Sequence, residues 1–545
     1  MNILRRAGSL FFLSAVYSAA TLAISDAVIT PEMQAAATQI TSQDIRAYVR
    51  HISSDAFEGR GPSTRADKKT QAYLRSELEN IGIKPGAPGG GWIQSVPLVG
   101  ITTHTPATLT LSHGEKLLTL NNHDDYIASA GQQKSSISIK DAEIVFVGYG
   151  IDAPEFNWND FKDVDVKGKI LLVMNNNPTV FAGKTRTYYG RWTYKYEQAA
   201  RMGAAGVIII HTTPSASYPW KVVQSSWTGE FFELKDEGKQ RIQMKGWATE
   251  DASRKIVELS SYDLDALRSA AQSRDFRPVP LGVKMSLDLQ STIHYSQSAN
   301  VIGKIPGSHA TLAKEAVIYS AHHDHLGMKR DLNTGQTLIY HGAIDNASGV
   351  SDLLSIVKAY SKLEQPIKRT IYFVFTASEE QGLLGSEYFV AHPSVPVSDM
   401  VANINIDGIG FYGRTRDITQ YGPGMSNLDE VLTSLASQQG RVVKPDPTPE
   451  NGGFYRADQL NFARAGVPVI YTYAGLDVIG KPAGWGKLQV ENFVKYDYHQ
   501  PSDSFKESFD FSGAVEDAQL EFYLGVNIAN ADERPVLSRN RMRIN

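Results

Sequence analysis

The chain has 545 residues, of which 42% are hydrophobic and 21% are charged, as in ordinary soluble globular proteins. Since a single hydrophobic core rarely grows beyond ~250–300 residues, this length predicts more than one domain. The formal net charge of −4 gives no reason to expect nucleic acid or an anionic membrane surface as a partner. The chain has no cysteine, which excludes disulfides and any thiolate metal site.

Residues 1–25 have the layout of a secretory signal peptide. Arg5 and Arg6 precede an apolar stretch at 7–23, and the later part of this stretch is rich in small residues such as Ser18. The stretch is too short, and too polar at its end, for a membrane span. We therefore expect a secreted or periplasmic protein with no stable membrane span after signal cleavage. The alternative is an N-terminal anchor helix.

The first part of the main domain is predicted over residues 40–135. Apolar residues recur at helical spacing from 41 to about 84, and the glycine-rich loop at 86–91 ends this pattern. The stretch that follows is rich in strand-forming residues, including a predicted strand at 107–111.

A second, β-rich unit is predicted over residues 136–285. It contains expected strands at 144–150, 169–174 and 206–211, with a helix near 194–202. This order resembles the protease-associated (PA) domain, a small module inserted in several exopeptidases and receptors. Because the candidate ligands described below lie outside it, we expect a separate module that narrows access to them.

Residues 295–545 form the second part of the main domain, and here apolar runs alternate with helical patterns. Strands are expected at 316–320, 370–376, 401–406 and 468–473, and helices at 348–363 and 383–391. Such alternation predicts an α/β fold, with a mostly parallel sheet flanked by helices. In sheets of this kind, ligands bind outside the carboxyl ends of the strands.

Five short motifs place metal-ligand residue types at or near these strand ends. Their key residues are His322, Asp345, the pair Glu379 and Glu380, Asp407, and His499. Two imidazoles and several carboxylates can hold two zinc ions around a water, which makes a hydrolase site. Alone, each motif has a plainer interpretation, such as a surface histidine cluster, a helix N-cap or solvated glutamates. Five in this order favour the metal site.

The directions of neighbouring side chains suggest which of these residues bind metal and which take a proton. Glu379 and Glu380 are adjacent, so their side chains diverge, and one can ligate a metal while the other takes a proton from water. Alternation along an extended segment puts His322 and Asp324 on one side, where the carboxylate can accept the second N–H of the imidazole. The same alternation puts His323 and His325 on the other side.

Tyr498 precedes His499, and its phenol could donate a hydrogen bond to an oxyanion. The alternative is a buried aromatic residue without a catalytic role.

Residues 40–135 and 295–535 together resemble the zinc aminopeptidase family M28. The matching motifs are His-x-Asp at 322–324, Asp-Asn-Ala-Ser-Gly at 345–349, Glu-Glu-x-Gly-Leu-x-Gly-Ser at 379–386, Asn-x-Asp at 405–407 and Tyr-His-x-Pro-x-Asp at 498–503. The resemblance implies a phosphorylase/hydrolase-like zinc exopeptidase fold with an inserted PA domain.

The resemblance also implies roles for these residues. The implied ligands of two zinc ions are His322 and Asp407 for one ion, Glu380 and His499 for the other, and Asp345 as the bridge. Glu379 is the implied general base and Asp324 orients His322. A cis Asp345–Asn346 bond is expected as well. One departure is Ala457-Asp458-Gln459, where members of the family often have Ser-Asp-His, and this leaves the part played by Arg456 open.

The expected function is that of an exported di-zinc aminopeptidase acting on peptides with a free N-terminus. Alternatives are a carboxypeptidase or a glutaminyl-cyclase-like zinc enzyme on the same fold; by the resemblance, cyclases work with one zinc. A third is a non-catalytic binding protein that carries a PA domain. No motif gives the preferred N-terminal residue or the oligomeric state.

Overall fold

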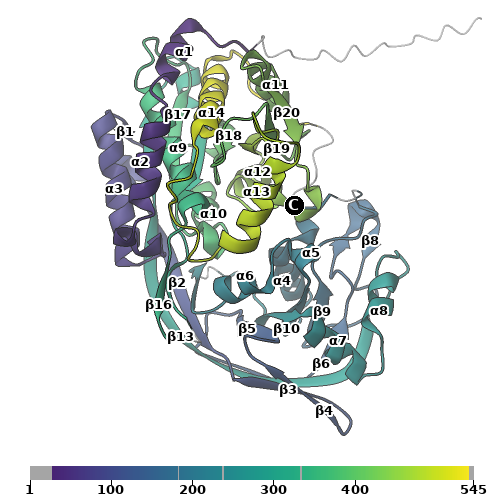
Figure 1. Ribbon diagram of the computed structural model, residues 1–545. Coiled ribbons are helices and arrows are strands. Elements are labelled where there is room, and N and C mark those ends of the chain that lie inside the picture. Colours follow the sequence, from purple (N-terminus) through teal and green to yellow (C-terminus); the bar gives the residue numbers. More distant parts are fainter. Residues whose placement is uncertain (1–26, 182, 184, 236–237, 332–333, 539–545) are drawn as a thin grey trace, which may run out of the picture.

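The computed structural model describes residues 27–538 except 182, 184, 236–237 and 332–333. The predicted signal peptide at 1–25 lies outside the described residues. The molecule has two lobes, one rich in helices and one rich in strands, and long strands run along both (Figure 1). Among the described helices, none combines the length and apolarity needed to cross a bilayer.

The helix-rich lobe is built on parallel strands, as predicted. The neighbours in order are β17 (Thr370–Thr376), β14 (Ala316–His322), β18 (Met400–Asn405) and β21 (Val469–Ala474). Strand β19 (Asp417–Tyr421) extends this sheet antiparallel to β21, and β20 (Val442–Pro445) lies parallel to β19. Every residue of β14, β17 and β18 is buried, which explains their unbroken apolar runs.

Helices cover both faces of this sheet, because successive strand residues point to opposite sides. In β14, Val317 and Tyr319 join a hydrophobic cluster with residues of α2 (Ser42–Ile52), α9 (Gly349–Tyr360) and α14 (Ser512–Asn530). Helices α1 (Pro31–Ala37), α3 (Arg65–Ile81) and α11 (Leu428–Gln438) contribute to the same cluster. Ile318 instead faces a cluster that includes residues of α10 (Leu384–Ala391) and α12 (Gln459–Arg464).

The strand-rich lobe has its own parallel sheet. Its strands in order are β6 (Ser136–Phe146), β9 (Ile170–Met174), β10 (Gly206–His211) and β12 (Met244–Thr249), with β5 (Tyr126–Ala130) antiparallel to β12. Its helices are α4 (Trp192–Arg201), α5 (Thr213–Ala216), α6 (Trp220–Ser226), α7 (Glu250–Leu259) and α8 (Leu264–Ala270). The helix expected near 194–202 and the strands expected at 169–174 and 206–211 are therefore present, whereas the strand expected at 144–150 runs over 136–146 instead.

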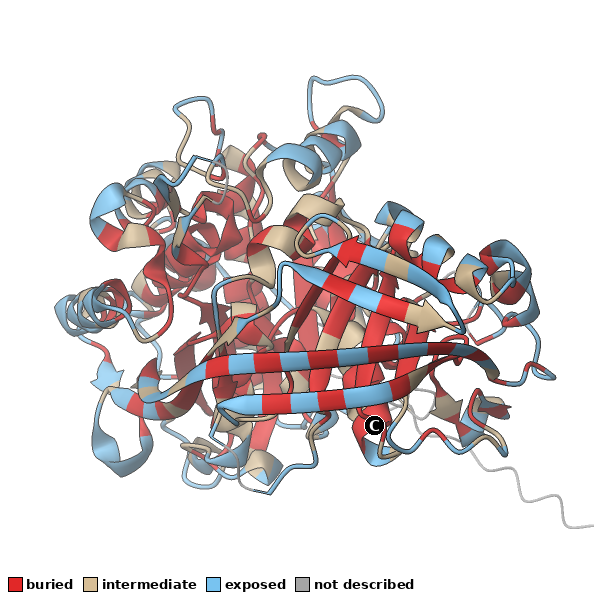
Figure 2. Ribbon diagram, turned by 90° about the horizontal axis from the view of Figure 1, so that it is seen from below, coloured by how far each residue is buried: buried red, intermediate tan, exposed pale blue. Residues whose placement is uncertain are grey.

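One strand belongs to both lobes. Strand β13 (Val279–Ile305) is 27 residues long and pairs in turn with β6, with β2 (Ile93–His104) and with β17. Residues 281–292 alternate between buried and exposed, a pattern visible along the long strands in Figure 2. Strand β11 (Glu230–Leu234) pairs with β2, so the strand-rich lobe is hydrogen-bonded to the other at a second place.

Helix α14 approaches the central sheet closely at Gly525. A Cβ atom at this position would lie 1.9 Å from the phenol oxygen of Tyr319 and 2.5 Å from that of Tyr360. Both rings are buried, and the Tyr319 hydroxyl donates to the carbonyl of Glu521 at 2.7 Å. The tyrosines cannot move away without breaking this packing.

We expect Gly525→Ala to lower the free energy of unfolding by about 1–3 kcal/mol because of overpacking. Alanine has a higher intrinsic helix propensity than glycine, by ~1 kcal/mol, so a net loss reports the clash. Urea unfolding followed by circular dichroism measures it. Gly91→Ala is the matched control, since a Cβ there has no neighbour within 4 Å. Equal stability of the two variants would contradict the packing argument.

Candidate metal centre

The candidate ligands meet at one edge of the parallel sheet. His322 is the last residue of β14, opposite Thr376 at the end of β17. Asp407 follows the end of β18, whose Asn405 lies opposite Ser320. Because these strands are parallel neighbours, their carboxyl ends bring residues far apart in the sequence together.

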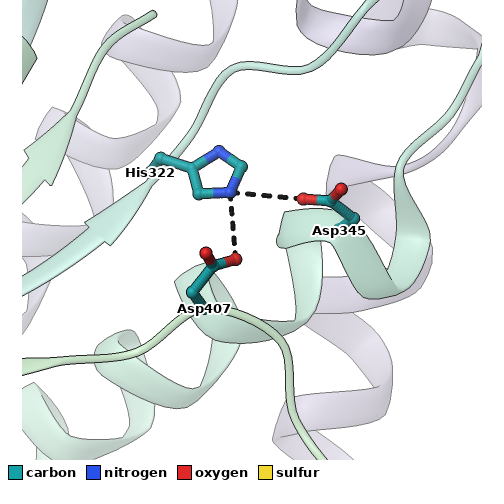
Figure 3. Close-up of side chains that lie close together, drawn as sticks. All are labelled: His322, Asp345 and Asp407. Atoms are coloured by element: carbon teal, nitrogen blue, oxygen red, sulfur yellow. Dashed lines mark hydrogen bonds and ion pairs between the residues drawn. The ribbon is translucent and has the colours of Figure 1, made fainter. Parts of the chain in front are cut away.

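The first group consists of His322, Asp345 and Asp407 (Figure 3). The Nε2 atom of His322 lies 3.2 Å from Oδ1 of Asp345 and 3.2 Å from Oδ1 of Asp407. The imidazole is only 2% exposed, so it has little contact with bulk water. Three ligand atoms thus converge, as the sequence predicted.

The second group lies on the other side of Asp345. The Nε2 atom of His499 lies 3.1 Å from Oδ2 of Asp345 and 3.0 Å from Oε2 of Glu380. The two oxygens of Asp345 therefore face different groups, Oδ1 towards His322 and Oδ2 towards His499. This is the arrangement that a bridging carboxylate requires.

The donor set fits zinc, which takes imidazole nitrogens and carboxylate oxygens as ligands. Ligand atoms of His322, Asp345 and Asp407 lie within 4.8 Å of one another, and so do those of His325, Asp345 and Glu380. With Glu379 also buried beside them, several carboxylates crowd one small region. Such crowding requires positive charge nearby, which a divalent cation supplies.

The pKa values follow from this crowding. Burial acts to raise the pKa of Asp345, but hydrogen bonding with His322 and His499 outweighs it and holds that pKa well below its usual range. Burial also opposes ionisation of Glu380, yet His499 and His325 bring its pKa to about 2. In Glu379 burial wins, with the help of nearby carboxylates, and the pKa lies well above its usual range.

Asp324 ties two of the strand-end loops together. Its carboxylate accepts the backbone N–H of Glu379 at 3.0 Å and that of Glu380 at 3.4 Å. One of its oxygens lies 3.6 Å from Nδ1 of His322, on the ring edge opposite the candidate metal. Asp324 is fully buried, so it holds both glutamates and faces His322 at once.

Arg60 fixes the backbone at His323 and at the segment just before Asp345. It is fully buried and donates to four carbonyl oxygens, those of His323 (2.9 Å), Ile52 (3.1 Å), His341 (2.6 Å) and Gly342 (2.9 Å). Burial lowers its pKa to about 10. The Asp-Ala-Phe-Glu-Gly-Arg segment at 55–60 thus ends in a side chain that fixes the loops around the centre.

The predicted placement of His325 is wrong. Expected on the side of His323, it instead places its Nδ1 atom 2.6 Å from Oε1 of Glu380. Strand β14 ends at His322, so the alternation of an extended chain does not continue to 325. His323 does face away, with Nε2 3.1 Å from the carbonyl oxygen of Ala299. No sequence signal separated the two histidines.

A residue of the strand-rich lobe also reaches the centre. The hydroxyl of Ser226, at the end of α6, lies 2.8 Å from Nδ1 of His499, the ring nitrogen opposite the candidate metal. The sequence gave no reason to expect this contact, because the two residues are 273 positions apart and serine is common on surfaces. The predicted insertion therefore takes part in the site.

Two further predictions concern the backbone and Tyr498. The Asp345–Asn346 peptide bond is cis, as expected. The ring of Tyr498 stacks on that of His499, with 3.9 Å between the ring centroids, and burial raises its pKa well above the usual value.

Two cavities meet beside Glu379, Glu380 and Tyr498, all of which line both. The first, here called the aromatic pocket, has a volume of about 230 Å³; its wall includes Tyr421, Tyr471, Tyr473, Val490, Phe493 and Val494. The second, here called the arginine pocket, has a volume of about 100 Å³; its wall includes Arg186, Arg191, Arg456, Trp192, Trp227 and Phe231. Asp345 and Asp407 border the aromatic pocket.

Comparisons with known proteins agree with this arrangement. Residues 300–522 match the model of Peptidase family M28, and residues 140–239 match the PA domain. Residues 300–522 are therefore a domain of Peptidase family M28, and residues 140–239 are a PA domain, as the motifs predicted. The family's zinc chemistry fits the His, Asp and Glu donors described above.

Individual relatives are distant. The aminopeptidase from Aneurinibacillus sp. strain AM-1 is similar in fold, with a TM-score of 0.53 and 17% identity, covering 93% of this chain and 98% of its own. The vacuolar membrane protease of Clavispora lusitaniae is 32% identical over 123 residues, 23% of this chain and 10% of the relative. That of Candida dubliniensis is 31% identical over 137 residues, 24% of this chain and 13% of the relative. The chain thus matches only a small part of these two proteases.

The contact between Ser226 and His499 leads to a test of metal binding. We expect Ser226→Ala to lower zinc affinity by about 10–100-fold, because the partner of a ligating imidazole fixes its orientation and tautomer. Competition with a zinc-binding dye measures the affinity. Ser269→Ala, an exposed serine on α8 of the same lobe, is the control. Identical affinities in the two variants would show that Ser226 does not support the site.

Proposed function

We propose that this chain is an exported di-zinc aminopeptidase that removes N-terminal residues from peptides. The observation that carries the proposal is the position of Asp345, whose two oxygens face two separate ligand groups. Glu379 lies beside this bridge, where the aromatic and arginine pockets meet. A bridged pair of cations next to a carboxylate at a junction of two pockets suits hydrolysis of a peptide bond.

His322 and Asp407 would hold one zinc, Glu380 and His499 the other, and Asp345 both. When bound, zinc supplies a Lewis acid and lowers the pKa of a coordinated water from ~15.7 towards ~7. His325, against Glu380, would orient that ligand rather than replace it, since its Nδ1 atom already faces the carboxylate at 2.6 Å.

Side chains of the protein would carry out the proton transfers and hold the reacting groups in position. Glu379, in our assignment the general base, takes a proton from the attacking water and returns it to the leaving amine. Its Oε2 atom lies 3.9 Å from Nε2 of His322, outside hydrogen-bonding distance, so the carboxylate is available for this step. Asp324 fixes the backbone of Glu379 and the ring of His322.

The α-amine and the oxyanion of a substrate would each have a partner near Glu379. The carboxylates of Asp345, Asp407 and Asp446 border the aromatic pocket and suit the positive charge of a free α-amine. The phenol of Tyr498, which lines both pockets, would donate to the oxyanion of the tetrahedral intermediate. Apolar walls around the carboxylates favour substrates with an apolar first residue.

A carboxypeptidase is the second candidate, and the buried arginines favour it. A cationic pocket beside the catalytic groups suits a free C-terminal carboxylate, whereas a glutaminyl cyclase has no use for one. Peptides blocked at the N-terminus distinguish the two peptidases. Their hydrolysis at the last bond would replace the aminopeptidase assignment with a carboxypeptidase.

Export rests on the signal-like pattern of residues 1–25. We propose a secreted or periplasmic location, with peptides as the substrates. Relatives such as the Clavispora lusitaniae protein are named vacuolar membrane proteases, so a membrane-associated location is the competing assignment. Fractionation of the producing cells, with immunodetection of the mature chain, decides between them.

We expect Glu379→Gln to lower kcat by at least ~10²–10⁴-fold, because it removes the proton acceptor and keeps the side-chain size. Both zinc ions should remain bound and KM should change little. Glu380→Gln is the matched comparison, since it weakens a metal ligand and should lower zinc content as well as rate. Bound zinc and single-turnover rates are measured on both variants.

Two outcomes would overturn these roles. Loss of zinc from Glu379→Gln, with both ions retained in Glu380→Gln, would reverse the two assignments. Unchanged activity in both variants would place catalysis elsewhere.

Removal of metal gives an independent prediction. Dialysis against a chelator should abolish peptide hydrolysis, and added zinc should restore it with an end point of two equivalents per chain. Atomic absorption and initial rates follow the titration. Full recovery at one equivalent would contradict the two-zinc assignment, and activity in the metal-free protein would contradict the mechanism altogether.

A further inference from the structure

The arginine pocket gathers positive charge that the protein does not neutralise. Arg186 is 5% exposed and Arg191 is 8% exposed, while Arg456 is half-buried at the border with the aromatic pocket. Among the described residues, no carboxylate oxygen lies within 4 Å of these three guanidinium groups. Burial, together with the nearby charge of Arg456, lowers the pKa of Arg186 to about 9.

Hydrogen bonds hold two of these side chains in place. Arg186 donates to the carbonyl of Ser215, and Arg456 donates to the carbonyl of Ala216 at 2.7 Å and to the hydroxyl of Ser217. These acceptors are neutral, so they orient the guanidinium groups without compensating their charge. The Nε atom of Arg186 is buried without a hydrogen-bond partner among the described residues.

Arg191 is the least satisfied of the three. Its side chain makes no hydrogen bond to any residue that the structure describes. Its guanidinium carbon lies 5.5 Å from the centre of the Trp192 ring, a cation–π contact. Glu379 is the acidic group that acts on it most strongly, but the two form no ion pair within 4 Å. A buried and unpaired guanidinium is costly, which indicates a site built to receive an anion.

The location of the pocket says which part of a substrate would bring that anion. The aromatic pocket contains the carboxylates that suit a free amine, and the arginine pocket adjoins it, with Glu379 and Tyr498 in the wall of both. A peptide whose scissile carbonyl lies at Glu379 would therefore place its first residue in the aromatic pocket. The residue after the cleaved bond would enter the arginine pocket.

We propose that the arginine pocket binds a carboxylate on the residue that follows the cleaved bond. The proposal rests on the proposed function and specifies its substrate class. The carboxylate has two possible sources, the free C-terminus of a dipeptide or an acidic side chain in a longer peptide. The volume of about 100 Å³ suits a single small residue. Arg191, the unpaired group, is the principal partner, and a planar guanidinium can bind a carboxylate through two hydrogen bonds.

The test compares four substrates: Leu-Ala, Leu-Ala amide, Leu-Glu amide and N-acetyl-Leu-Ala. We expect the wild-type protein to favour a carboxylate substrate over Leu-Ala amide by about 10–100-fold in kcat/KM, as for charge-assisted recognition. A preference for Leu-Ala identifies the terminal carboxylate, and one for Leu-Glu amide identifies the acidic side chain. Equal values for all the free-amine substrates would overturn the proposal.

Arg191→Gln should remove most of that preference, and Arg191→Lys, which keeps the charge but not the planar group, should remove part of it. Arg277→Gln is the matched control, because Arg277 is exposed on the same lobe and pairs with exposed Asp163. The preference should be unchanged in this control. A preference that survives both Arg191 substitutions would contradict the assignment to this residue.

Binding separates failure of this proposal from failure of the proposed function. Calorimetry with the Glu379→Gln variant should show tighter binding of the preferred carboxylate substrate than of Leu-Ala amide. If no free-amine peptide is hydrolysed but this difference in binding is present, the aminopeptidase function is contradicted and carboxylate binding by the arginine pocket is supported. If free-amine peptides are hydrolysed and the difference in binding is absent, the aminopeptidase function is supported and carboxylate binding by the arginine pocket is contradicted. Hydrolysis of N-acetyl-Leu-Ala would instead support carboxypeptidase action with the same pocket.

Discussion

The constraint on which the site depends is the repulsion between buried carboxylates. Asp345, Glu379, Glu380 and Asp407 meet in one small volume at the edge of the sheet, where little water screens their charges. The imidazoles and a bound cation supply the opposing charge. The backbone must also be held in place against this repulsion. The buried Arg60 helps, because it donates to carbonyl groups of three separate chain segments.

The sequence predicted the parallel sheet well because its strands are buried on both faces. Unbroken apolar runs such as those of β14 and β17 need no knowledge of tertiary contacts to be found. Most of the candidate ligands could be predicted for the same reason, since a polar residue just after such a run has to lie at the sheet edge. The roles of Glu379 and Glu380 came from a family resemblance and stay assignments to be tested.

What the sequence did not reveal depends on contacts between distant segments. His325 reaches Glu380 only because the chain leaves the strand after His322, and alternation cannot foresee where it does so. Ser226 and Arg191 lie in a lobe whose motifs carry no catalytic residue, yet the packing of the lobes brings both to the site. Side chains from the PA region therefore contact His499 and line the cavity beside Glu379.

Strand β13 has a mechanical consequence for how far the two lobes can move. At ~3.3 Å per residue, its 27 residues form a strand about 90 Å long along its curved path. This strand is hydrogen-bonded to sheets in both lobes. A hinge would need a flexible joint, but here any bending between the lobes strains a ladder of backbone hydrogen bonds. We therefore expect the distance between the two lobes to change little when a ligand binds, because such a change would strain the continuous pairing of β13.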